Sequence, residues 1–144
     1  ADERIKHYLE LFELADKAGT FLDGFSHGMQ QKAAIIGAML HNPKVIFLDE
    51  PTVGLDPRSA RLVKDLLVQH ARNGNAVFFS SHILEIVENM CDRVVIIQQG
   101  HILADAPVAE LRQMKGDQSL EDIFLDLTGG KDVDDMVKEL ADVS

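Results

Sequence analysis

The chain has 144 residues, of which 46% are hydrophobic, and this is enough for one globular domain with a core. Its formal net charge of −10 argues against a broad nucleic-acid-binding surface, which would need a basic face. A single cysteine, Cys91, excludes a disulfide framework within the chain and is typical of a reducing compartment. No run approaches the roughly 18 apolar residues that span a bilayer, and the charged amino-terminal residues do not resemble a signal peptide. We therefore expect a soluble or membrane-peripheral protein.

Hydrophobic periodicity and turn residues predict alternating helices and strands. Residues 3–18 have the pattern of an amphipathic helix that ends near Gly19, and Ser26 is a good N-cap for a helix through Met29–Leu40. His41-Asn42-Pro43 ends that helix. The elements expected after it are strands at 45–48, 76–79 and 94–97, helices at 58–72, 83–90, 108–114 and 120–127, a hairpin turn at Gln99-Gly100 into 102–106, and a tail helix at 131–144.

Two adjacent acids, Asp49 and Glu50, follow the apolar run Val45–Leu48. This run predicts a strand buried on both faces, and 94–97 predicts a further buried strand. Strand, helix and strand over residues 45–80 form a βαβ unit, so the two strands should be parallel. Asp49, Glu50 and His82 then lie at one edge of the sheet, where open α/β sheets bind ligands. The alternative is a strand followed by a solvated acidic turn.

Four segments together resemble the ATP-binding subunits of ABC transporters. They are FSHGMQQK (25–32), VIFLDEP (45–51), GLDP (54–57) and SSH (80–82), in the family's order and at close spacing. The ending SLEDIFLDLTGG is similar to that of bacterial ABC-2-type exporters. The resemblance implies an α/β fold, namely part of a P-loop NTPase core with a mostly parallel sheet flanked by helices.

The same resemblance implies a division of the chain. Residues 1–42 would be the end of a helical subdomain with the signature motif, and 43–106 the core with the Walker B segment, the D-loop and the switch histidine. Residues 107–130 would be terminal helices of the domain, and 131–144 a tail helix.

The resemblance also implies roles at the sheet edge. Asp49 would be the Walker B acid that holds Mg²⁺ through its water shell. Glu50 would orient and deprotonate the attacking water. His82 would contact the γ-phosphate, although a strand-end histidine can equally cap the next helix.

Ser26, His27, Gly28 and Met29 fall on the signature motif, which in the family binds the γ-phosphate of ATP held by a second subunit. Asp56 falls on the D-loop, which faces the dimer interface, although Asp-Pro is also an ordinary helix start. His27 stands where the family has glycine, and Met29 where it has glutamine. Met29 cannot donate a side-chain hydrogen bond, and Gln30 and Gln31 do not automatically replace it.

No G-x-x-x-x-G-K-[ST] phosphate loop occurs in the sequence. We therefore expect the carboxy-terminal part of such a subunit, with the phosphate-loop strand missing and the chain by itself inactive. In the family that strand separates the strands equivalent to 76–80 and 94–97. The chain should either close this gap by pairing the two strands or associate through it.

The function predicted by the resemblance is ATP binding and hydrolysis, with ATP and Mg²⁺ as cofactors, coupled to transport. The partners would be a transmembrane permease and a second ATP-binding subunit, with no nucleic acid, at the cytoplasmic face of the membrane. The alternatives are a soluble ABC-type ATPase unconnected with transport, a non-catalytic dimerisation module, and a metal-dependent hydrolase that uses Asp49, Glu50 and His82.

Overall fold

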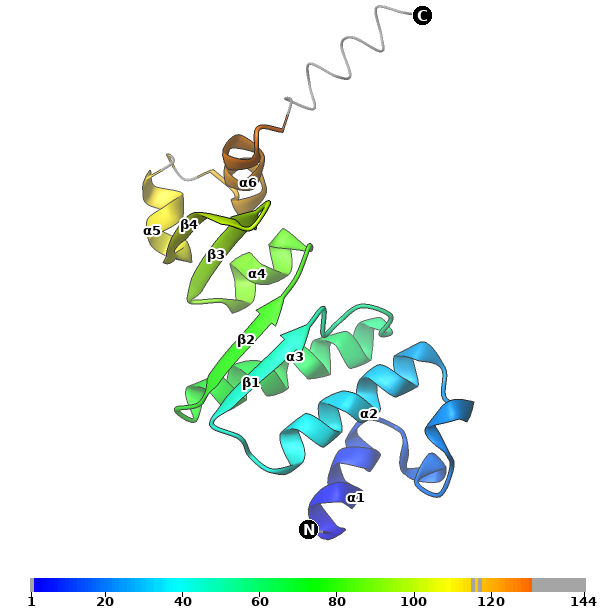
Figure 1. Cartoon of the computed structure of the whole chain (residues 1–144). Coiled ribbons are helices and arrows are strands. Elements are labelled where there is room, and N and C mark those ends of the chain that lie inside the picture. Colours follow the sequence, from blue (N-terminus) through cyan, green and yellow to red (C-terminus); the bar gives the residue numbers. More distant parts are fainter. Residues whose placement is uncertain (1, 115, 117, 131–144) are drawn as a thin grey trace, which may run out of the picture. The chain divides into compact units, whose positions relative to one another are not determined.

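The computed structural model describes residues 2–114, 116 and 118–130. The described residues divide into two compact units, one that ends at His82 and one that begins at Ile83 (Figure 1). Both contain strands and helices, which confirms the predicted α/β class. Among the described residues, no helix combines the length and the apolar character needed to cross a bilayer.

The first unit contains helix α1 (Asp2–Leu11), two 3-10 turns and helix α2 (His27–Leu40), followed by a β-α-β unit. That unit consists of strand β1 (Val45–Asp49), helix α3 (Pro57–Arg72) and strand β2 (Ala76–Ser80). The strands are parallel, as predicted, and in register from the Val45–Ala76 pair to the Asp49–Ser80 pair. Helix α3 begins where Asp56 caps it and Pro57 takes its first position, and Asn73-Gly74 ends it.

Helix α3 packs against β2 and lies behind the two strands in Figure 1. The core of this unit is formed by apolar side chains that are nearly inaccessible to solvent. It also includes His70, whose Nε2 lies 2.9 Å from the backbone oxygen of Pro43 and so ties α3 to the start of β1. The apolar members are Phe12, Leu14, Ile35, Ile36, Met39, Ile46, Val63 and Leu67.

The prediction of a strand buried on both faces was wrong. Ile46 is buried, but the Phe47 side chain is 76% exposed and Val45 47% exposed. The Phe47 ring stacks on Phe78 of β2 with 5.1 Å between centroids, and both rings remain open to solvent. A continuous apolar run therefore does not report how many faces of a strand are covered. In this unit the helices cover one face of the two-stranded sheet, and the face with Val45, Phe47 and Phe78 is open to solvent.

The prediction of a single helix over 3–18 was also wrong. Helix α1 ends at Leu11, and a separate 3-10 turn spans Ala15–Lys17. Glu13 takes a positive φ of 60°, and the backbone N–H of Leu14 donates to Leu9. A residue in the left-handed region with this bond pattern ends a helix and redirects the chain.

The second unit contains helix α4 (Leu84–Met90), the antiparallel strands β3 (Arg93–Gln98) and β4 (His101–Pro107), helix α5 (Val108–Met114) and helix α6 (Leu120–Thr128). The hairpin was predicted, and Gln99 and Gly100 both have positive φ, as its tight turn requires. A capping box at Ser119 starts α6, and Gly129 in the left-handed region ends it. The buried side chains here are Val87, Ile96, Val108, Leu111, Leu120 and Ile123.

The described strands form two separate two-stranded sheets, β1 with β2 and β3 with β4. Pairing of 76–80 with 94–97, one of the two outcomes expected from the sequence, is therefore not found. The antiparallel partner of β3 follows it through a two-residue turn, a connection with little loop-closure cost. Strand 94–97, predicted to be buried, is only partly so, because Val95 and Ile97 are exposed. The predicted tail helix at 131–144 lies outside the described residues.

Candidate active site

The carboxyl ends of β1 and β2 place four polar residues together. The last register pair of the parallel strands joins Asp49 to Ser80. Glu50 follows β1 directly and His82 follows β2 by two residues. The convergence of Asp49, Glu50 and His82 expected from the sequence is therefore present, and it results from the β-α-β connection.

Glu50 is held in an unusual conformation. Its φ is 45°, in the region that favours glycine. Its Oε1 accepts a hydrogen bond from the backbone N–H of His82 at 2.9 Å and lies 2.8 Å from His82 Nδ1. Its Oε2 is enclosed by protein atoms and has no hydrogen-bond partner among the described residues. One carboxylate oxygen is thus anchored, and the other is left as an unused acceptor.

Ser80 was not singled out from the sequence, yet it connects the two acids. Its Oγ donates to Asp49 Oδ1 and accepts from the backbone N–H of Glu50 at 3.2 Å. The available signal was the predicted parallel pairing, which puts a hydroxyl at the end of one strand beside a carboxylate at the end of the other.

Ser26, His27, Gly28 and Met29 form the start of α2, a helix of 14 residues. Ser26 is the N-cap, as predicted, and its Oγ accepts from the backbone N–H of Met29 at 3.3 Å. This capping bond needs only the main chain of Met29, so methionine does not disturb it.

The start of α2 lies directly against Gly54. A Cβ on Gly28 would be 2.7 Å from the backbone oxygen of Gly54, and a Cβ on Gly54 would be 2.7 Å from Cδ2 of His27. The histidine that replaces the family's glycine therefore packs its ring on the glycine of GLDP. Both positions require the absence of a side chain for this close approach.

Two further side chains of α2 contact the segment after β1. Gln31 Nε2 donates to the backbone oxygen of Glu50 at 3.4 Å, and Lys32 Nζ forms an ion pair with Asp56 Oδ2 at 3.2 Å. Gln30 Nε2 donates instead to the backbone oxygen of Leu22. Neither glutamine amide is therefore placed as a substitute for a glutamine at position 29.

Asp56 is the N-cap of α3. Its Oδ1 accepts from the backbone N–H of Ser59 at 2.9 Å, and its Oδ2 accepts from the Ser59 hydroxyl at 2.6 Å. These hydrogen bonds from Ser59, aided by Lys32, hold the pKa of the Asp56 carboxyl well below its usual range. Asp56 is therefore ionised at neutral pH.

The oxygen donors at the edge fit Mg²⁺ bound together with nucleotide phosphates. Magnesium prefers oxygen ligands and is usually held by one or two carboxylates plus phosphate oxygens and water. Asp49 offers an exposed carboxylate at the end of β1, of which Oδ1 is engaged by Ser80. No group of three His, Cys, Asp or Glu side chains within the described part of the chain is arranged to hold a metal ion by itself.

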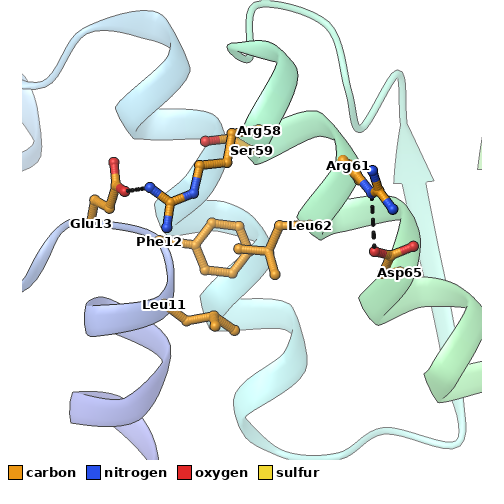
Figure 2. A pocket seen from close by; sticks show the side chains of 8 residues that line it. All are labelled: Leu11, Phe12, Glu13, Arg58, Ser59, Arg61, Leu62 and Asp65. Carbon is orange, nitrogen blue, oxygen red and sulfur yellow. Dashed lines mark hydrogen bonds and ion pairs between the residues drawn. The ribbon is translucent and has the colours of Figure 1, made fainter.

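A separate cavity of about 210 Å³ opens between α1 and the start of α3 (Figure 2). Figure 2 shows Phe12 and Leu62 at its apolar side, Arg58 reaching to Glu13, and Arg61 turned towards Asp65. Its lining includes none of Asp49, Glu50, Ser80 and His82. This cavity is therefore not the candidate active site, which lies at the sheet edge.

Comparison with known proteins relates this chain to nucleotide-binding proteins. The family described as "AAA domain, putative AbiEii toxin, Type IV TA system" matches residues 2–88. A solved protein described as "Structure of ATP binding subunit of ABC transporter" superposes with a TM-score of 0.83 and 31% identity, over 88% of this chain and 54% of that one. The α/β fold is that of an ABC ATPase.

Curated relatives agree with this match. The ABC transporter ATP-binding protein NatA of Bacillus subtilis is 35% identical over 85% of this chain and 50% of its own length. A fluoroquinolones export ATP-binding protein of Mycobacterium tuberculosis is 39% identical over 65% of this chain and 32% of its own length. The chain thus spans about a third to a half of the length of these relatives.

Proposed function

Because this chain belongs to the family of ABC transporter ATP-binding proteins, we propose that it carries the metal-binding and water-activating side of an ATP-hydrolysing site. The observation that carries the proposal is the pairing of Glu50 with His82 beside Asp49 at the carboxyl edge of two parallel strands. The four matching sequence segments supply the roles that this geometry accommodates.

Glu50 is proposed as the general base. Its Oε1 is fixed by two nitrogens of His82, and its Oε2 has no protein partner. An anchored carboxylate with one unused oxygen can accept a hydrogen bond from a water molecule and take its proton as the water attacks the γ-phosphate. Because Oε2 is enclosed by protein atoms in the structure, the proposed step requires that the groups covering it move aside when ATP and water bind.

Asp49 is proposed as the acid that holds Mg²⁺ through water. Its Oδ1 is engaged by Ser80, which orients the carboxylate from one side. When bound, Mg²⁺ would neutralise charge on the phosphates of ATP.

His82 is proposed to connect Glu50 with the substrate. Its Nδ1 lies 2.8 Å from Glu50 Oε1, which leaves Nε2 as the ring nitrogen available to the γ-phosphate. His82 would then hold the Glu50 carboxylate in place and also contact the γ-phosphate, which the water activated by Glu50 attacks. Loss of the γ-phosphate would remove one of its two partners.

The signature segment is proposed to act on ATP held by a second ATP-binding subunit. Ser26, His27, Gly28 and Met29 stand at the amino end of a long helix, where free N–H groups and the helix dipole favour an anion. Asp56, already ionised by its bonds to Ser59, would face the same dimer interface.

A transmembrane permease is the proposed partner that converts ATP hydrolysis into transport, and no nucleic acid is proposed as a partner. The proposed location is the cytoplasmic face of the membrane, reached through that permease. Since the sequence contains no G-x-x-x-x-G-K-[ST], we propose that residues 1–144 alone are inactive and that activity requires the complete protein.

The test is the Glu50→Gln variant of the complete protein as expressed from its gene. Removing the base should lower kcat for ATP hydrolysis by about 100-fold or more, because general-base catalysis contributes on that order. Calorimetric ATP binding should remain close to that of the unmodified protein, since the amide keeps the size of the side chain.

Glu10→Gln, an exposed change on α1, is the matched control and should leave kcat unaltered. Wild-type protein without Mg²⁺-dependent ATP hydrolysis, or a Glu50→Gln variant that turns over at the wild-type rate, would contradict the proposed function.

A further inference from the structure

Ser80 makes two hydrogen bonds of opposite sense at the end of β2. Its hydroxyl hydrogen goes to Asp49 Oδ1, and its oxygen receives the backbone N–H of Glu50 at 3.2 Å. No alanine, glycine or valine at this position could make either bond. Because Asp49 and Ser80 are register partners in the parallel strands, the Ser80 hydroxyl lies within reach of both Asp49 and Glu50.

The bond to the Glu50 amide supports a backbone conformation that is otherwise unfavourable. Glu50 has φ of 45°, which is uncommon for a residue with a Cβ and persists only where neighbouring groups determine it. Ser80 supplies one such group on the amide nitrogen, and Gln31 supplies a longer contact at 3.4 Å on the carbonyl oxygen. This conformation directs the Glu50 carboxylate to His82.

The bond to Asp49 acts on the other acid. With Oδ1 occupied by the Ser80 hydroxyl, rotation of the carboxylate is restricted, and Oδ2 is the oxygen that remains for a further partner. Groups of this kind, which orient a metal-binding carboxylate without touching the metal, affect both metal affinity and rate.

We propose that Ser80 is a positioning residue that sets the Asp49 carboxylate and the Glu50 backbone at once, so that the metal-binding acid and the base keep a fixed relative placement. The inference rests on the proposed function, because it assumes that Asp49 and Glu50 have those roles. Ser80 itself touches neither substrate nor metal in this scheme.

The experiment uses Ser80→Ala, Ser80→Cys and Ser80→Thr in the complete protein. Alanine and cysteine remove a strong hydroxyl donor while keeping the size of the exposed side chain nearly unchanged, and threonine retains the hydroxyl. Ser80→Ala and Ser80→Cys should lower kcat about 10- to 100-fold and raise the half-saturating Mg²⁺ concentration by a similar factor. Ser80→Thr should keep kcat and the half-saturating Mg²⁺ concentration close to their wild-type values.

Two readouts do not depend on turnover. Hydrogen exchange in the nucleotide-free protein should show faster exchange of the Glu50 amide in Ser80→Ala and Ser80→Cys, with neighbouring amides of β1 unchanged. Electron paramagnetic resonance with Mn²⁺ and ATP should show weaker metal binding in the same two variants. A residue with only a structural role would instead lower the melting temperature and leave the Mg²⁺ requirement as it was.

Thr20→Ala removes another exposed hydroxyl in the first unit and should match the unmodified protein throughout. If wild type and Glu50→Gln behave as proposed but Ser80→Ala keeps the wild-type Mg²⁺ requirement and Glu50 amide exchange, the inference about Ser80 is wrong and the proposed function stands. If the unmodified protein shows no Mg²⁺-dependent hydrolysis of ATP, the proposed function fails, and this inference fails with it.

Discussion

The Asp56 side chain stabilises both its own helix, α3, and the contact of that helix with α2. Its carboxylate caps α3 through Ser59 and pairs with Lys32 on α2. The resulting lowering of its pKa has a consequence for stability. A carboxyl group whose pKa is lowered by folding stabilises the protein above its unfolded pKa of about 3.9, and that contribution is lost as pH falls below this value.

We expect Asp56→Asn to lower the melting temperature by a few degrees near pH 7, because asparagine caps a helix but cannot attract Lys32 as an anion. The difference from wild type should persist down to about pH 5 and shrink as the pH falls below about 4, because Asp56 of the unfolded chain then takes up a proton while the folded carboxylate stays ionised. Urea unfolding of both proteins between about pH 3 and pH 7 measures this difference in stability.

Asp16→Asn is the control for that experiment, because Asp16 is exposed and pairs only with its neighbour Lys17 among the contacts described. A stability difference for Asp56→Asn that does not change with pH would contradict the ionised cap.

Helix α2 and the segment after β1 behave as one structural element. His27 and Gly28 pack on Gly54, Gln31 contacts Glu50, and Lys32 pairs with Asp56. The residues proposed for the signature motif, the base and the D-loop are therefore connected by direct contacts within the first unit. This gives position 27 a role that glycine could not have, since the histidine ring fills the space above Gly54.

Gly54→Ala should destabilise the protein by roughly 1–3 kcal/mol, because alanine is strained at φ of 77° and its Cβ would meet the His27 ring at 2.7 Å. In a His27→Gly background the steric part disappears while the backbone strain remains, so the cost of Gly54→Ala should be smaller. A double-mutant cycle by chemical unfolding isolates this coupling.

Gly37→Ala is the control, because this glycine-to-alanine change should raise the free energy of unfolding instead of lowering it. Gly37 lies within α2 with open space around it, so alanine should stabilise the helix by about 0.5–1 kcal/mol. An equal cost of Gly54→Ala in the presence and absence of the His27 ring would refute the packing described.

At the scale of the whole molecule, each unit has a sheet with an uncovered apolar face. In the first unit it consists of Val45, Phe47 and Phe78, and in the second of Val95, Ile97 and Ile102. Contiguous exposed apolar side chains on sheets favour association. Of the two outcomes expected from the sequence, association therefore remains as a prediction.

We expect the 144-residue chain to self-associate in a concentration-dependent manner and Phe47→Ser to weaken that association, because it removes one of two stacked rings from the apolar face. Sedimentation velocity over a range of concentrations measures the effect. Phe21→Ser, which removes an exposed ring on a loop, is the control and should leave association unaltered. A monomer at all concentrations would show that these faces do not drive association.

The sequence by itself determined most of the elements and the acidic end of the site. Helix α5 coincides with its predicted range, the hairpin turns at Gln99-Gly100, and α2 starts after its Ser26 cap. These features depend on neighbours a few residues away, which a sequence displays directly. The convergence of Asp49, Glu50 and His82 also followed, since a β-α-β connection makes its two strands parallel.

Only the tertiary structure decided which faces are covered and which partners are shared. The exposure of Phe47, the end of α1 at Leu11, the contact of His27 with Gly54 and the two bonds of Ser80 all depend on atoms brought together by packing. Ser80 and Asp49 are separated by 31 residues along the chain, and no local pattern encodes the register that joins them. Burial and side-chain partners belong to the assembled sheet, and the periodicity of one strand does not contain them.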